Sequence, residues 1–89
     1  MHEASLMRGL MRNLQSLAAA ENATHLKRVK VWLGALSHFS PEHFREHFKE
    51  ASAGTCAENA TLEIEVSTDM ANPHAQDVRI ESVEIEVPE

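Results

Sequence analysis

This sequence is poor in cysteine, in positive charge and in long apolar runs. Cys56 is the one cysteine among 89 residues, so the chain can form neither an internal disulfide nor a CxxC half-site for zinc, and we expect a reducing, cytoplasmic setting. Eight basic residues against fourteen acidic ones give a net charge of −6, without any basic run, which argues against nucleic acid as a partner. No apolar stretch approaches the ~20 residues of a membrane span, and the N-terminus lacks the pattern of a secretory signal.

Catalytic motifs are also missing, because the sequence has no glycine-rich phosphate loop and no spacing that suggests a serine, histidine and acid triad. His43 and His47 lie one helical turn apart and could bind zinc with a third ligand, and Glu46 and Glu50 are near them. The run HFREHF lacks, however, the glutamate directly after the first histidine that a metalloprotease helix requires. We therefore expect a solvated helix face there, and we do not expect an enzyme.

The composition is typical of one soluble globular domain, with 43% hydrophobic and 25% charged residues, and we take residues 1–89 as that domain. Residues 5–21 predict an amphipathic helix, because leucines recur at helical spacing and Ser5 can cap its start. Its expected apolar stripe consists of Leu6, Leu10, Leu14 and Leu17, widened by Met7, Met11 and Ala18. Arg8 and Arg12 take the polar face.

Residues 26–37 alternate like a half-buried strand, with one side formed by Val29, Val31, Leu33 and Ala35. Trp32 is on the polar side beside Arg28 and Lys30, where it could contact a partner or be shielded by a basic side chain.

A second helix is predicted between Ser40 and Gly54. Ser40 can accept hydrogen bonds from the first amides, Pro41 needs no donor in the first turn, and Gly54 suits the left-handed residue beyond the last turn. Its apolar seam would contain Phe44, Phe48 and Ala51.

Two more strands are predicted at residues 61–67 and 78–87, separated by a short polar loop at residues 68–77. The apolar residues of the last strand change parity near Glu81-Ser82, which predicts a β-bulge. We expect an α+β fold in the order helix, strand, helix, strand, strand, a two-layer sandwich with both helices on one face of a three-stranded sheet. The uncovered face would carry charges of both signs: Arg28, Lys30, Glu63, Glu65, Glu84 and Glu86.

The first three residues, Met1-His2-Glu3, could form a metal site of their own. A free α-amine, the following peptide nitrogen and the His2 imidazole can chelate a divalent ion in fused rings, with the Glu3 carboxylate close enough to complete a square. Square-planar nitrogen and oxygen ligands suit Ni(II) or Cu(II). The alternative is a solvated terminus without metal.

Four segments in this order resemble the HypA/HybF family of nickel metallochaperones, which help to mature nickel–iron hydrogenases and in some organisms urease. They are MHEASL, RVKVWLGALSHFSPEHF, EASAGTCAENATLEIE and RIESVEIE. The resemblance implies transient Ni(II) binding by Met1, His2 and Glu3. It also implies two partners, a nickel-handling GTPase contacted near the first helix and the precursor of a hydrogenase large subunit. Arg8, Arg12 and Trp32 are candidate contact residues for such partners.

One departure from the family is large. Its members normally insert a zinc-binding lobe with two CxxC pairs between the last two strands, where this chain has only residues 68–77. We therefore expect no structural zinc, and we expect this short segment to close a simple hairpin. The first hypothesis is a nickel metallochaperone, and the second is an adaptor without the zinc lobe that docks hydrogenase-assembly proteins and delivers no metal. A small hydrolase that uses His43, His47 and Glu46 is a third alternative.

Overall fold

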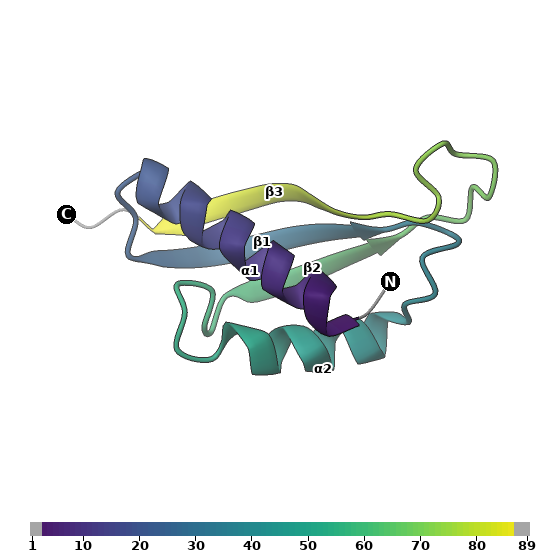
Figure 1. Ribbon diagram of the computed structural model, residues 1–89. Coiled ribbons are helices and arrows are strands. Elements are labelled where there is room, and N and C mark those ends of the chain that lie inside the picture. Colours follow the sequence, from purple (N-terminus) through teal and green to yellow (C-terminus); the bar gives the residue numbers. More distant parts are fainter. Residues whose placement is uncertain (1–2, 87–89) are drawn as a thin grey trace.

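The computed structural model describes residues 3–86, with Glu3 described by its backbone alone (Figure 1). The elements are α1 (Glu3–Ala20), β1 (His25–Leu33), α2 (Pro41–Ser52), β2 (Thr61–Val66) and β3 (Val78–Glu86). Both helices lie on one face of the three-stranded sheet, which confirms the predicted α+β sandwich (Figure 1). None of the helices within residues 3–86 is long and apolar enough to cross a membrane.

The apolar stripe of α1 agrees with the predicted one except at Leu17. Leu10 and Leu14 are buried as expected, but Leu17 is 44% exposed and Ser5 lies inside the helix, where it cannot be the cap. The buried face includes Met7, Met11 and Ala18, as predicted. Met7 and Met11 also line a cleft between α1 and α2.

The sheet order is β2-β1-β3, with β2 parallel and β3 antiparallel to β1. The helix α2 connects the two parallel strands as their crossover. The predicted bulge is confirmed, because Lys30 pairs with Ser82 and Val31 with Ile80, which leaves Glu81 as the extra residue. A second irregularity at Lys27 was not predicted; it lets Leu26 and Val29, three residues apart, both be buried.

Strand β1 ends at Leu33, four residues before the predicted end. Beyond it the amides of Gly34 and Leu36 donate to the carbonyls of Asp77 and Ala75, at 2.9 and 2.7 Å, instead of continuing a ladder with a strand. The segment that follows β2 therefore crosses the end of β1 and reaches β3 on the far side. The expected hairpin between β2 and β3 is wrong, because β1 lies between them.

The uncovered face of the sheet has the predicted mixed charge. Arg28 lies 3.4 Å from Glu63 and 3.7 Å from Glu84, while Lys30 lies 3.7 Å from Glu65 and 3.4 Å from Glu81. Each cation of β1 thus bridges to both neighbouring strands. All these side chains are at least one third exposed, so solvent screens the pairs and each contributes little to stability.

Candidate functional site

The predicted metal ligands lie at the edge of the described chain. Met1 and His2 are outside the described residues, and Glu3 is the first residue of α1. The proposed chelate is therefore next to the start of a helix whose inner face is buried in the core, and Ala4 is the first residue with a described side chain.

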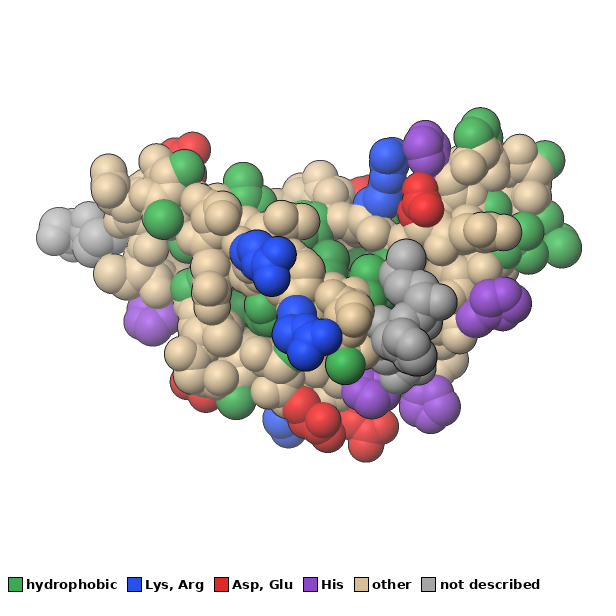
Figure 2. All heavy atoms as spheres, in the orientation of Figure 1, with side chains coloured by type: hydrophobic (Ala, Val, Ile, Leu, Met, Phe, Trp, Pro, Cys, Tyr) green, Lys and Arg blue, Asp and Glu red, His purple; other side chains and the backbone are tan. Residues whose placement is uncertain are grey.

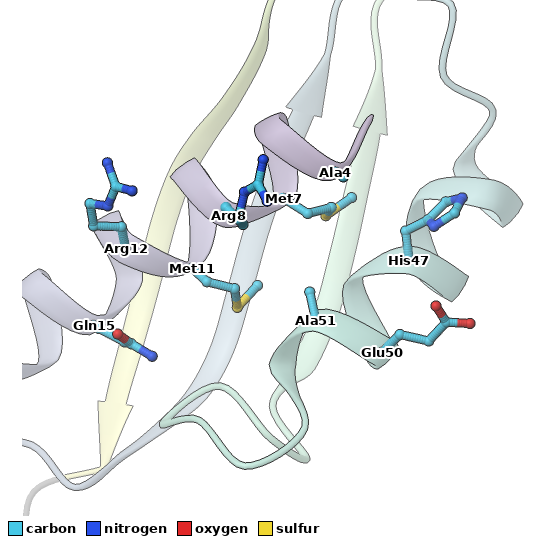
Figure 3. A pocket seen from close by; sticks show the side chains of 9 residues that line it. All are labelled: Ala4, Met7, Arg8, Met11, Arg12, Gln15, His47, Glu50 and Ala51. Atoms are coloured by element: carbon cyan, nitrogen blue, oxygen red, sulfur yellow. The ribbon is translucent and has the colours of Figure 1, made fainter. Parts of the chain in front are cut away.

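A cleft of ≈ 750 Å³ lies between α1 and α2 at this point (Figure 3). Its walls are formed from α1 by Ala4, Met7, Arg8, Met11, Arg12 and Gln15, and from α2 by His47, Glu50 and Ala51. The two helices start at the same end of the molecule, and Figure 3 shows Ala4 and His47 at one end of the cleft and Gln15 at the other.

The sequence of α2 explains which groups face this cleft. Ser40 accepts a hydrogen bond from the His43 amide at 3.2 Å and fixes the start of the helix. Phe44 and Phe48 are then buried under the sheet, with 0% and 3% exposure. At helical spacing, His47 and Ala51 fall beside these phenylalanines and turn toward α1.

The two sides of the cleft differ in charge. Figure 2 shows basic side chains over α1, whereas acidic side chains and histidines gather over α2. Arg8 and Arg12 are exposed on the α1 side, and Arg8 donates a hydrogen bond to Ser5 Oγ at 3.3 Å. These arginines, predicted as partner contacts, are thus placed on the same cleft as His47.

Trp32 lies apart from this cleft. It is half-buried on the uncovered sheet face, and it lines a smaller hollow with Asn72, His74, Arg79, Ile80 and Glu81. The structure therefore places the three predicted contact residues on two separate surfaces. Arg8 and Arg12 line the cleft between the helices, and Trp32 is on the uncovered face of the sheet.

Among the described side chains, those of residues 4–86, no three histidine, cysteine, aspartate or glutamate residues converge as a metal site would require. His43 is exposed and absent from the cleft walls, so the structure does not bring it together with His47 around a third ligand. Cys56 lies in the turn after α2, and burial raises the pKa of its thiol above the ordinary 9.0. Burial therefore favours the protonated thiol over the thiolate.

The sequence identified His47 only as half of a zinc pair, and missed its place opposite the start of α1. A signal was present, because Ala51 of the apolar seam follows His47 by four residues and shares its side of the helix. The approach of α1 to that side could not be read from local spacing.

Comparison with known proteins gives consistent results. A family model described as "Hydrogenase/urease nickel incorporation, metallochaperone, hypA" matches residues 1–74. Hydrogenase maturation factor HypA of Moorella thermoacetica is 42% identical over 65 residues, which is 73% of this chain and 58% of that protein. The factor of the same name from Methanosarcina mazei is 38% identical over 66 residues, 74% of this chain and 48% of that protein. The chain thus spans about half the length of these curated relatives.

The fold has a solved counterpart. The solution structure of the Ni metallochaperone HypA from Helicobacter pylori superimposes with a TM-score of 0.78 at 18% identity, covering 96% of this chain and 97% of that one. At this identity the likeness supports the fold.

Proposed function

Because this chain belongs to the HypA family, we propose that it binds Ni(II) through Met1, His2 and Glu3 and passes the ion to a partner during maturation of a nickel–iron hydrogenase or urease. The observation that carries the proposal is the family match, which includes these three residues and is described by nickel incorporation. The position of Glu3 at the first turn of α1 supports it, since a helix anchored in the core can hold a short chelate in one place.

The chemistry of the chelate fits a carrier. In a chain that starts at Met1, the amine, the peptide nitrogen and the His2 imidazole supply three nitrogen ligands, and the Glu3 carboxylate supplies an oxygen. Such ligands suit a square-planar d8 ion. The amine and the imidazole must lose their protons to bind, so nickel affinity falls as the pH falls. A site built on a chain end can release its ion readily. The same ligands hold Cu(II) more tightly, so metal supply and the partner must provide selectivity.

We propose a GTPase that handles nickel as the donor or acceptor of the ion. Arg8 and Arg12 support this, because they lie on the same cleft as the start of α1 and offer cations to an acidic partner surface. Delivery to a hydrogenase large subunit precursor belongs to the same proposal. With a single cysteine in the sequence, we propose that no structural zinc is required.

The test uses untagged protein with a free amine at Met1. We expect equimolar, diamagnetic yellow Ni(II) binding, measured by calorimetry and absorption, which is lost in His2→Ala and in a variant with one extra N-terminal residue. Both changes remove a chelating nitrogen without touching the core. Equal nickel affinity in all three proteins would contradict the proposal.

An adaptor that delivers no metal is the second candidate, and Trp32 favours it. A half-buried tryptophan on a charged, uncovered sheet face is a common centre for a protein contact. For an adaptor, Trp32→Ala weakens binding to the partner in a fluorescence titration, while His2→Ala leaves both partner affinity and hydrogenase maturation intact.

A further inference from the structure

Strand β3 leaves one of its edges open. It pairs with β1 along one side, and no other strand of residues 3–86 borders it (Figure 1). Alternate amides and carbonyls along its nine residues therefore point away from the sheet, where another strand can pair with them. The edge formed by β2 differs, because this strand has six residues and Arg45 of α2 donates a hydrogen bond to the Leu62 carbonyl at 3.0 Å. Extension of the sheet is therefore expected at β3.

The face of β3 that turns toward the helices is only partly covered. Its apolar side chains are half-buried, whereas those of β1 on the same face are fully buried. A groove of ≈ 670 Å³ lies between α1 and β3, and its apolar lining consists of Leu10, Leu17, Val78 and Ile80. Leu17 is 44% exposed. Apolar surface thus continues to the open edge of the sheet, and a strand added there would remove part of it from water.

The bulge gives β3 a pattern that is complementary to itself. The strand changes face at Glu81, so Arg79 before the bulge and Glu84 after it both lie on the open face. A bulge normally protects an edge from pairing, because it interrupts the ladder. In two antiparallel copies about a twofold axis between Glu81 and Ser82, however, the two bulges meet. Equivalent faces then match on both sides of the axis.

This register places apolar residues opposite apolar ones and a cation opposite an anion. The pairs on the helix-covered face are Val78 with Ile85 and Ile80 with Val83. On the open face Arg79 lies opposite Glu84 of the other copy, and symmetry forms this pair twice. Arg79 has no ion-pair partner within the part of the chain that the structure describes. The like charges of Asp77 and Glu86 meet at the two ends of the register, where solvent screens them.

We propose that the open edge of β3 pairs with β3 of a second copy of this chain, antiparallel and about a twofold axis at Glu81-Ser82. The two three-stranded sheets then form one continuous sheet of six strands. The cleft between α1 and α2 lies on the other side of α1, where Met7 and Met11 line it, so it stays open in each copy. The proposal goes beyond the nickel function and does not depend on it.

The first experiment measures the mass of the untagged protein by analytical ultracentrifugation from micromolar to millimolar concentration. We expect the wild type to change from one chain to two. Arg79→Glu should dimerise at least about tenfold more weakly, because two attractive pairs become repulsive. Adding Glu84→Arg to this variant should restore association, since the two charges are then exchanged.

Lys49→Glu provides a matched control. Lys49 is exposed in the last turn of α2, away from β3, and its replacement makes the same change in net charge as Arg79→Glu. We expect this control to associate as the wild type does. Circular dichroism checks that each variant keeps the fold.

A second experiment tests the register without any change of charge on β3. In a Cys56→Ala background, Ser82→Cys places a thiol beside the proposed axis, where mild oxidation should link two chains by a disulfide. Thr61→Cys, at an exposed position on β2, is the control and should give few linked chains.

Three results would overturn the proposal. One is a chain that stays single up to millimolar concentration. Another is a dimer that Arg79→Glu leaves unchanged or that the double charge reversal does not restore, since its interface then lies elsewhere. The third is equal cross-linking through positions 82 and 61. Each of these results leaves the nickel proposal standing, because nickel binding is measured separately.

Discussion

Gly34 lies where two backbone segments approach each other closely. A Cβ atom there would collide with the carbonyl oxygen of Ala75 and lie 2.9 Å from that of Asp77. Both neighbours are main-chain atoms of the segment that crosses the end of β1, so they cannot move away as a flexible side chain does. Gly9 differs, because a Cβ added in the middle of α1 meets nothing within 4 Å.

We predict that Gly34→Ala destabilises the fold by about 2 kcal/mol or more, because it displaces Ala75 and stretches the hydrogen bonds from Gly34 and Leu36. Gly9→Ala should stabilise it by about 0.5–1 kcal/mol through helix propensity. Urea denaturation of both variants gives the two free energies of unfolding. A neutral Gly34→Ala would mean that the crossing segment packs less tightly against β1.

At the scale of elements, α2 is fixed by its ends and by one face. Ser40 caps its first turn, Gly54 takes the left-handed conformation after its last turn with φ 78, and Phe44 and Phe48 are buried between them. Because His47 is one residue before Phe48, the rotation of α2 that buries the phenylalanines also fixes the direction in which the His47 side chain leaves the helix. The position of His47 on the cleft wall thus depends on the start of the helix.

We predict that Ser40→Ala destabilises the protein by about 1 kcal/mol, since the His43 amide loses its acceptor. Ser40→Asn should retain the wild-type stability, because asparagine caps equally well. Thermal unfolding followed at 222 nm measures both. Equal losses in the two variants would show that the serine hydroxyl acts through another contact.

At the scale of the whole molecule, we expect the free energy of unfolding to decrease at alkaline pH. A hydrogen bond to Glu81 and the nearby charges of Glu81 and Glu65 raise the pKa of Lys30 above its ordinary 10.5. Burial raises the pKa of Cys56 above 9.0. In both cases the folded state binds a proton more tightly than the unfolded chain. Each contribution is present in full below the ordinary value and is lost as the pH rises through the folded one.

We therefore predict that the urea midpoint is flat near neutral pH and falls as the pH rises above about 9. Cys56→Ala should remove the first part of the decrease, and Lys30→Gln the part above about pH 10.5. Urea titrations at pH 7, 9, 10 and 11 measure this. A midpoint that increases over this range would contradict the sign of both shifts.

Much of the fold followed from local patterns. Alternation in β1, the caps of α2 and the parity change near Glu81 each depend on neighbours in sequence, and the structure confirms them. The features that the sequence did not predict correctly have a common origin. The end of β1 at Leu33, the exposure of Leu17 and the crossing of residues 67–77 depend on which distant segments lie opposite them.

The sequence by itself determined the fold class, the family and the candidate nickel ligands Met1, His2 and Glu3, because these depend on periodicity, short motifs and chemical type. Only the tertiary structure decided the strand order, the separation of Trp32 from Arg8 and Arg12, and the placement of His47 and Ala4 on one cleft. Those features depend on how the helices and strands pack around a shared core, and the geometry of such packing is set by side chains far apart in the chain.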